Sequence, residues 1–418
     1  MRELLGRNWR RATLIAAIPV AMVSKFVALF ALPDYYFWDS NLYVAATLFD
    51  GNALPSDFVS SMDPGEYRKF YRNFSAFYED VYSSDDQTRQ FTIEFYRTIN
   101  IFGFDSTAQW SVFMGVIGTV LLMTVAWHSV HISLPQSAFF LSSVGLLNIF
   151  AFGITKETIQ ICFFILMIAF MMIVMRILRR YDIAVLPMQL SCLVAASMVL
   201  ALEGIVFRGY YMIMIPLMFV ALLLLSMLKK HDAPLAISPL IVFAIMSTAL
   251  CIMLVCGTLL FPYINGALTW MKGNVLARDG QVASSTLIMD LLPGYGLAGA
   301  VANYPLDALR MLFPVELLFK QPMSASYVLF FLFQVFVDVM LVLAIRTSQR
   351  QGADSGASAD IGSVSALCVV LAFMTVSFLF EPDFGSWTRH ESAAFPLLWM
   401  AFSTVRRSQC QVCRQETE

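Results

Sequence analysis

The sequence predicts an all-α, polytopic integral membrane protein with about ten transmembrane helices and two long outer loops. Hydrophobic residues make up 59% of the 418 residues and charged residues only 13%, a balance typical of membrane-embedded chains. Predominantly apolar stretches of about 20 residues, the length that a helix needs to cross the hydrocarbon core, recur along the chain. No internal repeat is visible, so we treat residues 1–418 as a single transmembrane domain.

Each expected helix is an apolar stretch of spanning length. In chain order these stretches are 12–32, 108–127, 136–152, 158–175, 184–202, 210–228, 237–262, 324–345, 362–380 and 392–405. The first follows a basic start, as the core of a signal peptide does, but it is long and Lys25 interrupts it. We therefore expect an uncleaved first helix.

Lys and Arg in the short loops and tails set the expected orientation. The segments on the side of the N-terminus hold Arg2, Arg7, Arg10, Arg11, Arg176, Arg179, Arg180, Lys229, Lys230, Arg346, Arg350, Arg406, Arg407 and Arg414. The short loops of the other side hold one such residue each, namely Lys156, Arg208 and Arg389. We therefore expect both termini to be cytoplasmic.

The seven cysteines predict no disulfide framework, because none lies in an expected outer loop. Cys410 and Cys413 form a lone C-x-x-C in the C-terminal tail, without a second pair or a histidine partner. We expect no bound metal and no cofactor.

Two long segments are expected on the outer side. The loop 33–106 carries twelve acidic and five basic residues, and 19 of its 74 residues are aromatic. Aromatic faces with interleaved carboxylates bind sugars, whereas an amphipathic loop would place the same rings at headgroup level. We favour sugar binding for 32–43 and the interfacial reading for 89–104. The Gly- and Pro-rich segment 263–323 is expected to form re-entrant or surface-lying helices.

Three shorter outer clusters carry ionisable side chains next to expected helices. Their members are Lys156 and Glu157; Glu203, Arg208, Tyr210 and Tyr211; and Glu381, Asp383, Arg389, His390 and Glu391. Ionisable groups at the membrane edge are costly, and a water-filled site or a partner usually accounts for them. A solvated turn or an interfacial anchor would explain the first two clusters equally well, but the third holds more charge than a turn needs.

Two ionisable residues lie inside expected helices. Lys25 is about 12 Å from the outer end at helical rise, too deep to reach water comfortably, so it should pair with a carboxylate or face a polar cavity. Asp338, one turn from Gln334, would serve either a proton or ion path in a transporter or helix packing.

The sequence has no nucleotide-binding or hydrolase motif, so nothing in it indicates nucleotide hydrolysis on the cytoplasmic face. On the outer face there is no ATP, and a substrate there must carry its own activated bond. A polyprenyl-diphosphate sugar does so, and its transfer needs a carboxylate base, cations for the diphosphate and a glycan groove. The candidate cations are Lys156, Arg208 and Arg389, and the candidate carboxylates are Asp39, Glu157, Glu203, Glu381, Asp383 and Glu391. The aromatic residues of 35–43, Trp38 among them, would stack on sugar.

The segments YYFWDSNLY (35–43), TKET (155–158), FRGYY (207–211) and EPDFGSWTRHESAAFP (381–396) together resemble membrane polymerases and C-type glycosyltransferases of bacterial capsule, exopolysaccharide and O-antigen gene clusters. The resemblance implies action on undecaprenyl-diphosphate-linked oligosaccharide at the outer face of the inner membrane. It covers Asp39, the pair Lys156 and Glu157, Arg208 with Tyr210 and Tyr211, and Arg389 with His390. The large loop after the first helix is typical of C-type glycosyltransferases, whereas O-antigen polymerases often carry their main outer loops later.

We therefore expect a polysaccharide polymerase first and a single-sugar glycosyltransferase second. The expected partners are the polyprenyl-diphosphate-linked glycan, membrane lipid and other polysaccharide assembly proteins, and no nucleic acid. A transporter or flippase of lipid-linked glycan is the alternative from another class, and Lys25 and Asp338 favour it. A membrane acyltransferase or a scaffold without chemistry has less in its favour.

Overall fold

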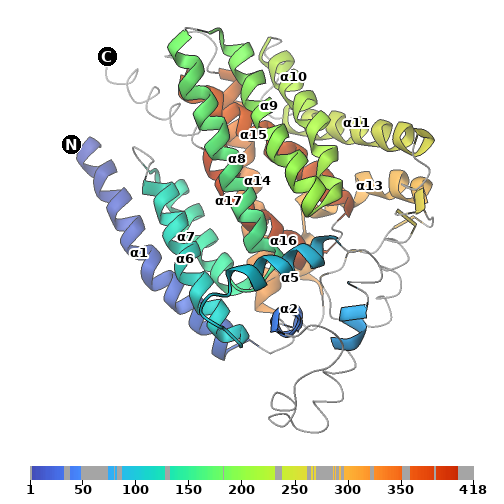
Figure 1. Ribbon diagram of the computed structural model, residues 1–418. Coiled ribbons are helices and arrows are strands. Elements are labelled where there is room, and N and C mark those ends of the chain that lie inside the picture. Colours follow the sequence, from blue (N-terminus) through green and yellow to red (C-terminus); the bar gives the residue numbers. More distant parts are fainter. Residues whose placement is uncertain are drawn as a thin grey trace. The chain divides into compact units, whose positions relative to one another are not determined.

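A computed structural model describes residues 2–32, 38–48, 74–79, 81, 87–127, 132–181, 183–230, 238–260, 296–320, 324–350, 358–380 and 383–402, with a few single residues between 265 and 292. The described chain is helical, as the sequence predicts (Figure 1). Eight of its helices are long and apolar enough to cross a membrane, and the helix Leu134–Phe150 is a shorter apolar one. The class of helical membrane protein is thus supported, while the expected number of about ten spans stays a prediction.

The helices form two compact units. Unit 1 comprises Met1–Phe163 and Leu202–Gly209, and unit 2 comprises Phe164–Ala201 and Tyr210–Glu418. The expectation of a single transmembrane domain stays a prediction. The helices of unit 1 are α1 (Arg2–Phe30), α2 (Trp38–Leu48), α5 (Gln87–Ile99), α6 (Thr107–Trp127) and α7 (Leu134–Phe150), with the start of α8 (Lys156–Leu178) and the end of α9 (Val185–Val206).

In unit 1, α1 packs along both α6 and α7, and Figure 1 shows the three helices side by side. Small and polar residues allow this close approach. The hydroxyls of Thr13 and Ser137 share a hydrogen bond of 2.7 Å, and Asn148 donates to the Thr119 hydroxyl at 3.0 Å. Gly118 leaves the space that the ring of Phe152 fills. Tight packing of small residues and interhelical hydrogen bonds are what hold helices together in lipid.

The segment 33–106, expected as a loop, contains helices where it is described. The inner face of α2 is buried in unit 1, and Tyr43 is 2% exposed with its ring edge-on to Phe77 at 5.6 Å. Tyr43 is therefore a core residue rather than a sugar-stacking one. Residues 35–37 and the side chain of Trp38 lie outside the described part. The stretch 89–104 supplies most of α5, an amphipathic helix that buries Thr92, Ile93 and Tyr96.

Unit 2 is built around α15 (Ser358–Phe380), which is almost entirely buried. The helices that contact α15 are α10 (Met214–Lys230), α11 (Ser238–Leu260), α13 (Gly296–Leu312), α14 (Ala325–Arg350), α16 (Phe384–Ala393) and α17 (Phe395–Phe402). Three short 3-10 helices complete the described chain, η2 (Arg179–Tyr181), η3 (Gly209–Ile213) and η4 (Val315–Leu318). The apolar sequence of α15 thus meets protein on all sides instead of lipid.

The expected last span, 392–405, is interrupted where it is described. The backbone N–H of Ala394 donates to the carbonyls of His390 and Glu391, which closes α16, and α17 begins at Phe395. Pro396 follows at once and has no N–H to continue the helical hydrogen bonds of α16. The result is two short helices in place of one long helix.

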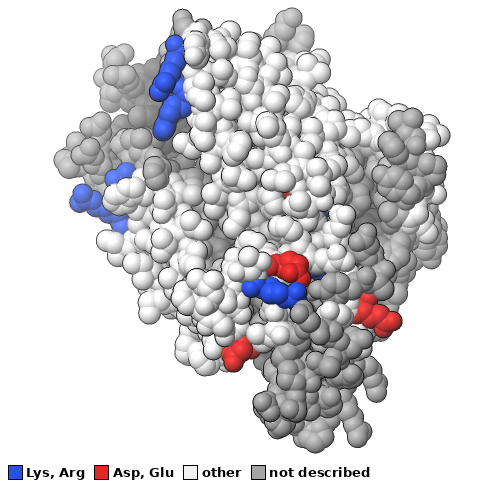
Figure 2. Space-filling model, viewed as in Figure 1, with Lys and Arg blue, Asp and Glu red and all other residues white. Residues whose placement is uncertain are grey.

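Apolar side chains cover the outside of the bundle. Large hydrophobic residues of α8, α9 and α10 are exposed, for example Ile173, Met198 and Leu223. The face in Figure 2 is white over the middle of these helices, and blue side chains appear at the end of α8 that leads into η2. A continuous uncharged surface of this kind fits a hydrocarbon environment.

The close approach at Gly118 generates a test. Replacing Gly118 with Ala should lower stability by about 1–3 kcal/mol, because the new methyl group collides with the buried ring of Phe152. Gly145 on α7 is the matched control, since a methyl group there would meet Ser24 Oγ at 3.5 Å, an ordinary contact. Thermal unfolding of the detergent-purified protein measures both variants, and equal melting temperatures would contradict the packing described here.

Candidate functional site

The start of α8 and the end of α9 meet α5 in unit 1 through an aromatic stack. The rings of Phe91, Phe163 and Phe207 lie 5.9–6.4 Å from one another, one ring from each segment. Thr88 donates a hydrogen bond to the Phe207 carbonyl at 2.7 Å. These contacts hold α5 against the helix ends that carry two of the predicted charged clusters.

Tyr96 provides the second attachment of α5. Its hydroxyl donates to the Gly153 carbonyl at 2.8 Å and accepts the Thr155 backbone N–H at 3.1 Å. Burial raises the pKa of the Tyr96 phenol above its usual value, so the group stays neutral. The turn that precedes Lys156 is thereby fixed by a residue that sequence reasoning did not single out.

Five buried polar residues lie on α5, at the start of α8 and at the end of α9, and we call them the end cluster of unit 1: Tyr96, Glu157, Gln160, Glu203 and Arg208. Glu203 is fully buried, and its two carboxyl oxygens have no hydrogen bond within the described chain. Arg208 is 3% exposed and is the charged group that acts on Glu203. Its backbone N–H donates to the Glu203 carbonyl at 2.9 Å, which closes the end of α9.

Arg208 also contacts the aromatic ring of Phe207. The guanidinium carbon lies 5.4 Å from the centroid of the Phe207 ring, within the range of a cation–π contact. A buried charge is retained only where partners offset its loss of hydration. The end cluster therefore concentrates a cation, two carboxyl groups and aromatic surface at one end of unit 1.

The remaining predicted residues of unit 1 differ in exposure. Asp39 is exposed in the first turn of α2. Lys156 is half-buried at the start of α8, next to the buried Glu157. The structure thus brings Glu157, Glu203 and Arg208 into the interior and leaves Asp39 at the surface.

Tyr210 and Tyr211 belong to unit 2, whereas Arg208 belongs to unit 1. Tyr211 is fully buried and edge-on to Phe373 at 6.1 Å. Tyr210 stacks on Phe380 at 4.9 Å with an interplanar angle of 20°. Both rings pack against α15, Tyr211 as a core residue and Tyr210 as a half-buried one.

The charged cluster 380–392 folds mainly as α16. Asp383 is its N-cap: its side chain accepts the Ser386 backbone N–H at 2.9 Å and the Thr286 hydroxyl at 2.8 Å. Arg389 is half-buried and His390 is buried, whereas Glu381 lies outside the described residues. Asp383 therefore has the geometry of a helix cap, and its catalytic role stays a prediction.

One face of α16 meets α14 in a buried polar network that consists of Gln334, Asp338, Trp387 and Glu391. The Trp387 indole N–H donates to Gln334 Oε1 at 2.5 Å, and the Gln334 amide donates to Asp338 Oδ1 at 3.0 Å. Burial, and next the charge of Asp338, raise the pKa of Glu391 well above its usual value, although the Gln334 amide opposes this. The spacing of Gln334 and Asp338 predicted their contact, but nothing in the sequence predicted their meeting with Trp387 and Glu391.

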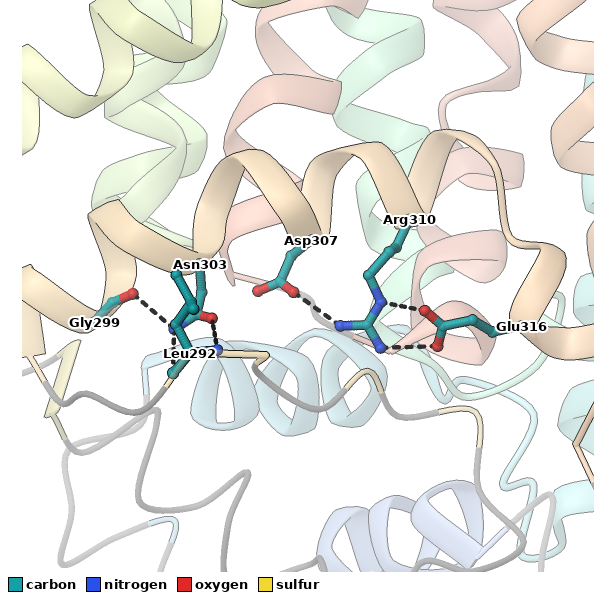
Figure 3. Close-up of polar contacts among 6 residues, drawn as sticks. All are labelled: Leu292, Gly299, Asn303, Asp307, Arg310 and Glu316. Carbon is teal, nitrogen blue, oxygen red and sulfur yellow. Dashed lines mark hydrogen bonds and ion pairs between the residues drawn. The ribbon is translucent and has the colours of Figure 1, made fainter.

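A further charged group missed by sequence reasoning lies on α13. Arg310 pairs with Glu316 of η4 through Nε and, at 2.8 Å, through Nη2, and with Asp307 at 3.3 Å (Figure 3). Asn303 on the same helix holds the backbone of Leu292 through both its N–H and its carbonyl. Two carboxylates satisfy the Arg310 guanidinium, so this group ties α13 to η4.

Lys25 finds other partners than those expected. Its ammonium donates to Ser111 Oγ at 2.9 Å and to the Phe152 carbonyl, instead of to a carboxylate. No three His, Cys, Asp or Glu side chains come close enough to hold a metal in the part of the chain that the structure describes. Cys410 and Cys413 lie outside that part.

Comparison with protein-family models, with curated proteins and with solved structures found no match. The proposals below therefore rest on the described residues and on the chemistry of their arrangement.

The role of Asp383 can be tested by two substitutions. Asp383→Ala should lower stability by about 1 kcal/mol, because the first turn of α16 loses its cap, whereas Asp383→Asn retains a good capping group and should be close to wild type in stability and activity. Thermal unfolding and a glycan assay on the same preparations separate the possibilities. An Asn variant that folds normally but is inactive would return Asp383 to the catalytic residues.

Proposed function

We propose that the protein is a glycosyltransferase of the bacterial inner membrane that acts on undecaprenyl-diphosphate-linked oligosaccharide at the outer face and joins polysaccharide repeat units. The observation that carries this proposal is the end cluster of unit 1, where Arg208 and Glu203 are buried together beside aromatic rings. With cytoplasmic termini, as the distribution of Lys and Arg favours, this end of α8 and α9 is the outer one.

The proposed reaction needs a cation where the diphosphate leaves. The acceptor hydroxyl forms a bond to the anomeric carbon, the bond from that carbon to the diphosphate oxygen breaks, and negative charge develops on the diphosphate. The planar guanidinium of Arg208 presents five donors, so it can keep internal partners and still bind phosphate oxygens in a bidentate manner. Lys156, half-buried at the start of α8, would add a second positive charge.

The reaction also needs a base for the proton of the acceptor hydroxyl. Glu203 is the carboxylate next to Arg208, and its oxygens have no hydrogen bond within the described chain. Glu157, in the first turn of α8 near Tyr96, is the second candidate. Arg208 is the charged group that acts on Glu203, so phosphate binding and base chemistry are linked at this site.

Access to the buried cluster must involve α5. Glu203 is fully buried and Arg208 is 3% exposed, while α5 is attached by the hydrogen bonds of Thr88 and Tyr96. The proposal therefore requires α5 to shift when glycan binds. Asp39 is exposed on α2, which contacts α5, and in this proposal it would meet the glycan.

Arg208 provides the direct test. In a strain that lacks the gene, wild type should restore long surface polysaccharide, and Arg208→Lys should lower polymerisation on the order of 10²-fold or more, as loss of a transition-state donor does. The exposed Arg176, at the other end of α8, is the control, and Arg176→Ala should behave as wild type. Each variant must be present in the membrane at wild-type abundance. Full activity of Arg208→Lys would contradict the assigned role.

The glycan products decide between polymerase and single-sugar transferase. Loss of long chains with accumulation of single repeat units indicates a polymerase, whereas repeat units one sugar short indicate a single-sugar transferase. Parallel variants Glu203→Gln, Arg389→Ala and Asp39→Asn show which other predicted residues are needed.

A transporter or flippase of lipid-linked glycan is the second candidate, and the buried carboxyl groups of Asp338 and Glu391 favour it. Intact lipid-linked repeats retained on the cytoplasmic side of the null strain would support this class and contradict the transferase.

A further inference from the structure

We propose that Asp338 and Glu391 together form a proton-binding site inside unit 2, in which Glu391 stays protonated at neutral pH beside Asp338. The site lies between α14 and α16 and is distinct from the end cluster of unit 1. Glycosyl transfer as proposed above makes no use of it.

The orientation of Gln334 fixes the geometry of the site. Its carbonyl oxygen accepts the indole N–H of Trp387 at 2.5 Å, so its amide nitrogen must point the other way, where it donates to Asp338 Oδ1 at 3.0 Å. Trp387 is 1% exposed and Gln334 is 2% exposed. The amide therefore cannot turn around without leaving a buried indole N–H unsatisfied.

The carboxyl oxygens outnumber the donors at this site. Asp338 Oδ1 accepts the Gln334 amide at 3.0 Å, and the same amide acts on Glu391. Asp338 Oδ2 and both oxygens of Glu391 are buried without a close hydrogen bond within the described chain. Glu391 is 1% exposed, and its carboxyl group feels the charge of Asp338. Two ionised carboxylates would be very costly at this buried site, and a proton on Glu391 removes their repulsion.

No described cation takes the place of that proton. The elements that pack against α14 are α10, α11, α13, α15, α16, α17 and η4. The described charged or protonatable groups on these elements include Asp307, Arg310, Glu316, Arg389 and His390, the phenol of Tyr304, and the thiols of α11 and α15. On α14 itself, Arg346 is a further charged group. Neither oxygen of Glu391 accepts a hydrogen bond from any of these groups within the described chain.

The ligand is a proton rather than a metal ion because of the number of oxygens. Hard cations such as Mg²⁺ and Ca²⁺ take about six or more oxygen ligands, and three carboxyl oxygens are without a hydrogen bond here. A proton needs only one donor and one acceptor oxygen. Glu391 is the carboxyl group that keeps it, since burial and the charge of Asp338 both raise its pKa.

Infrared spectroscopy of the full-length protein in detergent tests the proposal. At neutral pH, wild type should show the carbonyl stretch of a protonated carboxylic acid that Glu391→Gln removes and Glu203→Gln, the matched control at another buried carboxyl group, retains. Asp338→Asn removes the neighbouring charge, so titration of the remaining band should move to lower pH. A spectrum without any Glu391-dependent band, or an unchanged midpoint in Asp338→Asn, would overturn the proposal.

Stability against pH gives a second readout that does not depend on spectral assignment. The folded-state pKa of Glu391 is raised, so its contribution to stability is fully present below the unfolded pKa and is lost as pH rises through the folded pKa. The melting temperature of wild type should therefore fall over this range more steeply than that of Glu391→Gln, which is neutral at every pH. If the melting temperatures of wild type and Glu391→Gln changed equally with pH, the proposed site would be contradicted.

Replacement of choline chloride by sodium chloride at constant ionic strength distinguishes a metal cation from a proton. The melting temperature of wild type should not change, and a rise that Glu391→Gln abolishes would overturn the proton in favour of Na⁺. If Glu391→Gln does not fold, Asp338→Asn alone decides through its titration midpoint.

Discussion

Ionisable side chains inside apolar helices must find their partners within the protein, and much of this architecture follows from that requirement. Lys25 reaches Ser111 and the Phe152 carbonyl, and Gly115 leaves the space for its aliphatic chain. The same Phe152 occupies the space beside Gly118. One buried ammonium therefore fixes how closely α1, α6 and the end of α7 approach one another.

The helical membrane class could be predicted from the sequence because hydropathy accumulates over a whole span, and no single residue decides it. Contacts between the spans could not be predicted in this way. Gln334 and Asp338 are one turn apart, so their hydrogen bond follows from helix geometry. Trp387 and Glu391 meet Gln334 and Asp338 only because α16 packs on α14. The helix break at Ala394 permits this packing, and the sequence did not predict it because Ala394 lies within an apolar stretch.

The candidate site was predictable in its residue types and not in its grouping. Sequence reasoning treated all outer charges as one site, whereas Arg208 belongs to unit 1 and Arg389 to unit 2. Asp383 caps the N-terminus of α16, whereas the sequence pattern predicted the start of a helix only at residue 392. Nothing in the sequence distinguished Arg310 from a surface residue, because its partner Glu316 lies on a separate element, η4. Polar residues near a membrane boundary can thus cap a helix, as Asp383 does, or join two elements, as Arg310 does.

The burial of α15 has a consequence for how the chain is made. A helix that ends up surrounded by protein is still apolar enough to enter the bilayer when it emerges from the ribosome. By then α10, α11, α13 and α14 have been synthesised, but α16 and α17 have not. One side of α15 is therefore covered by lipid until the last helices arrive, and unit 2 reaches its native packing only after synthesis of the C-terminal segment.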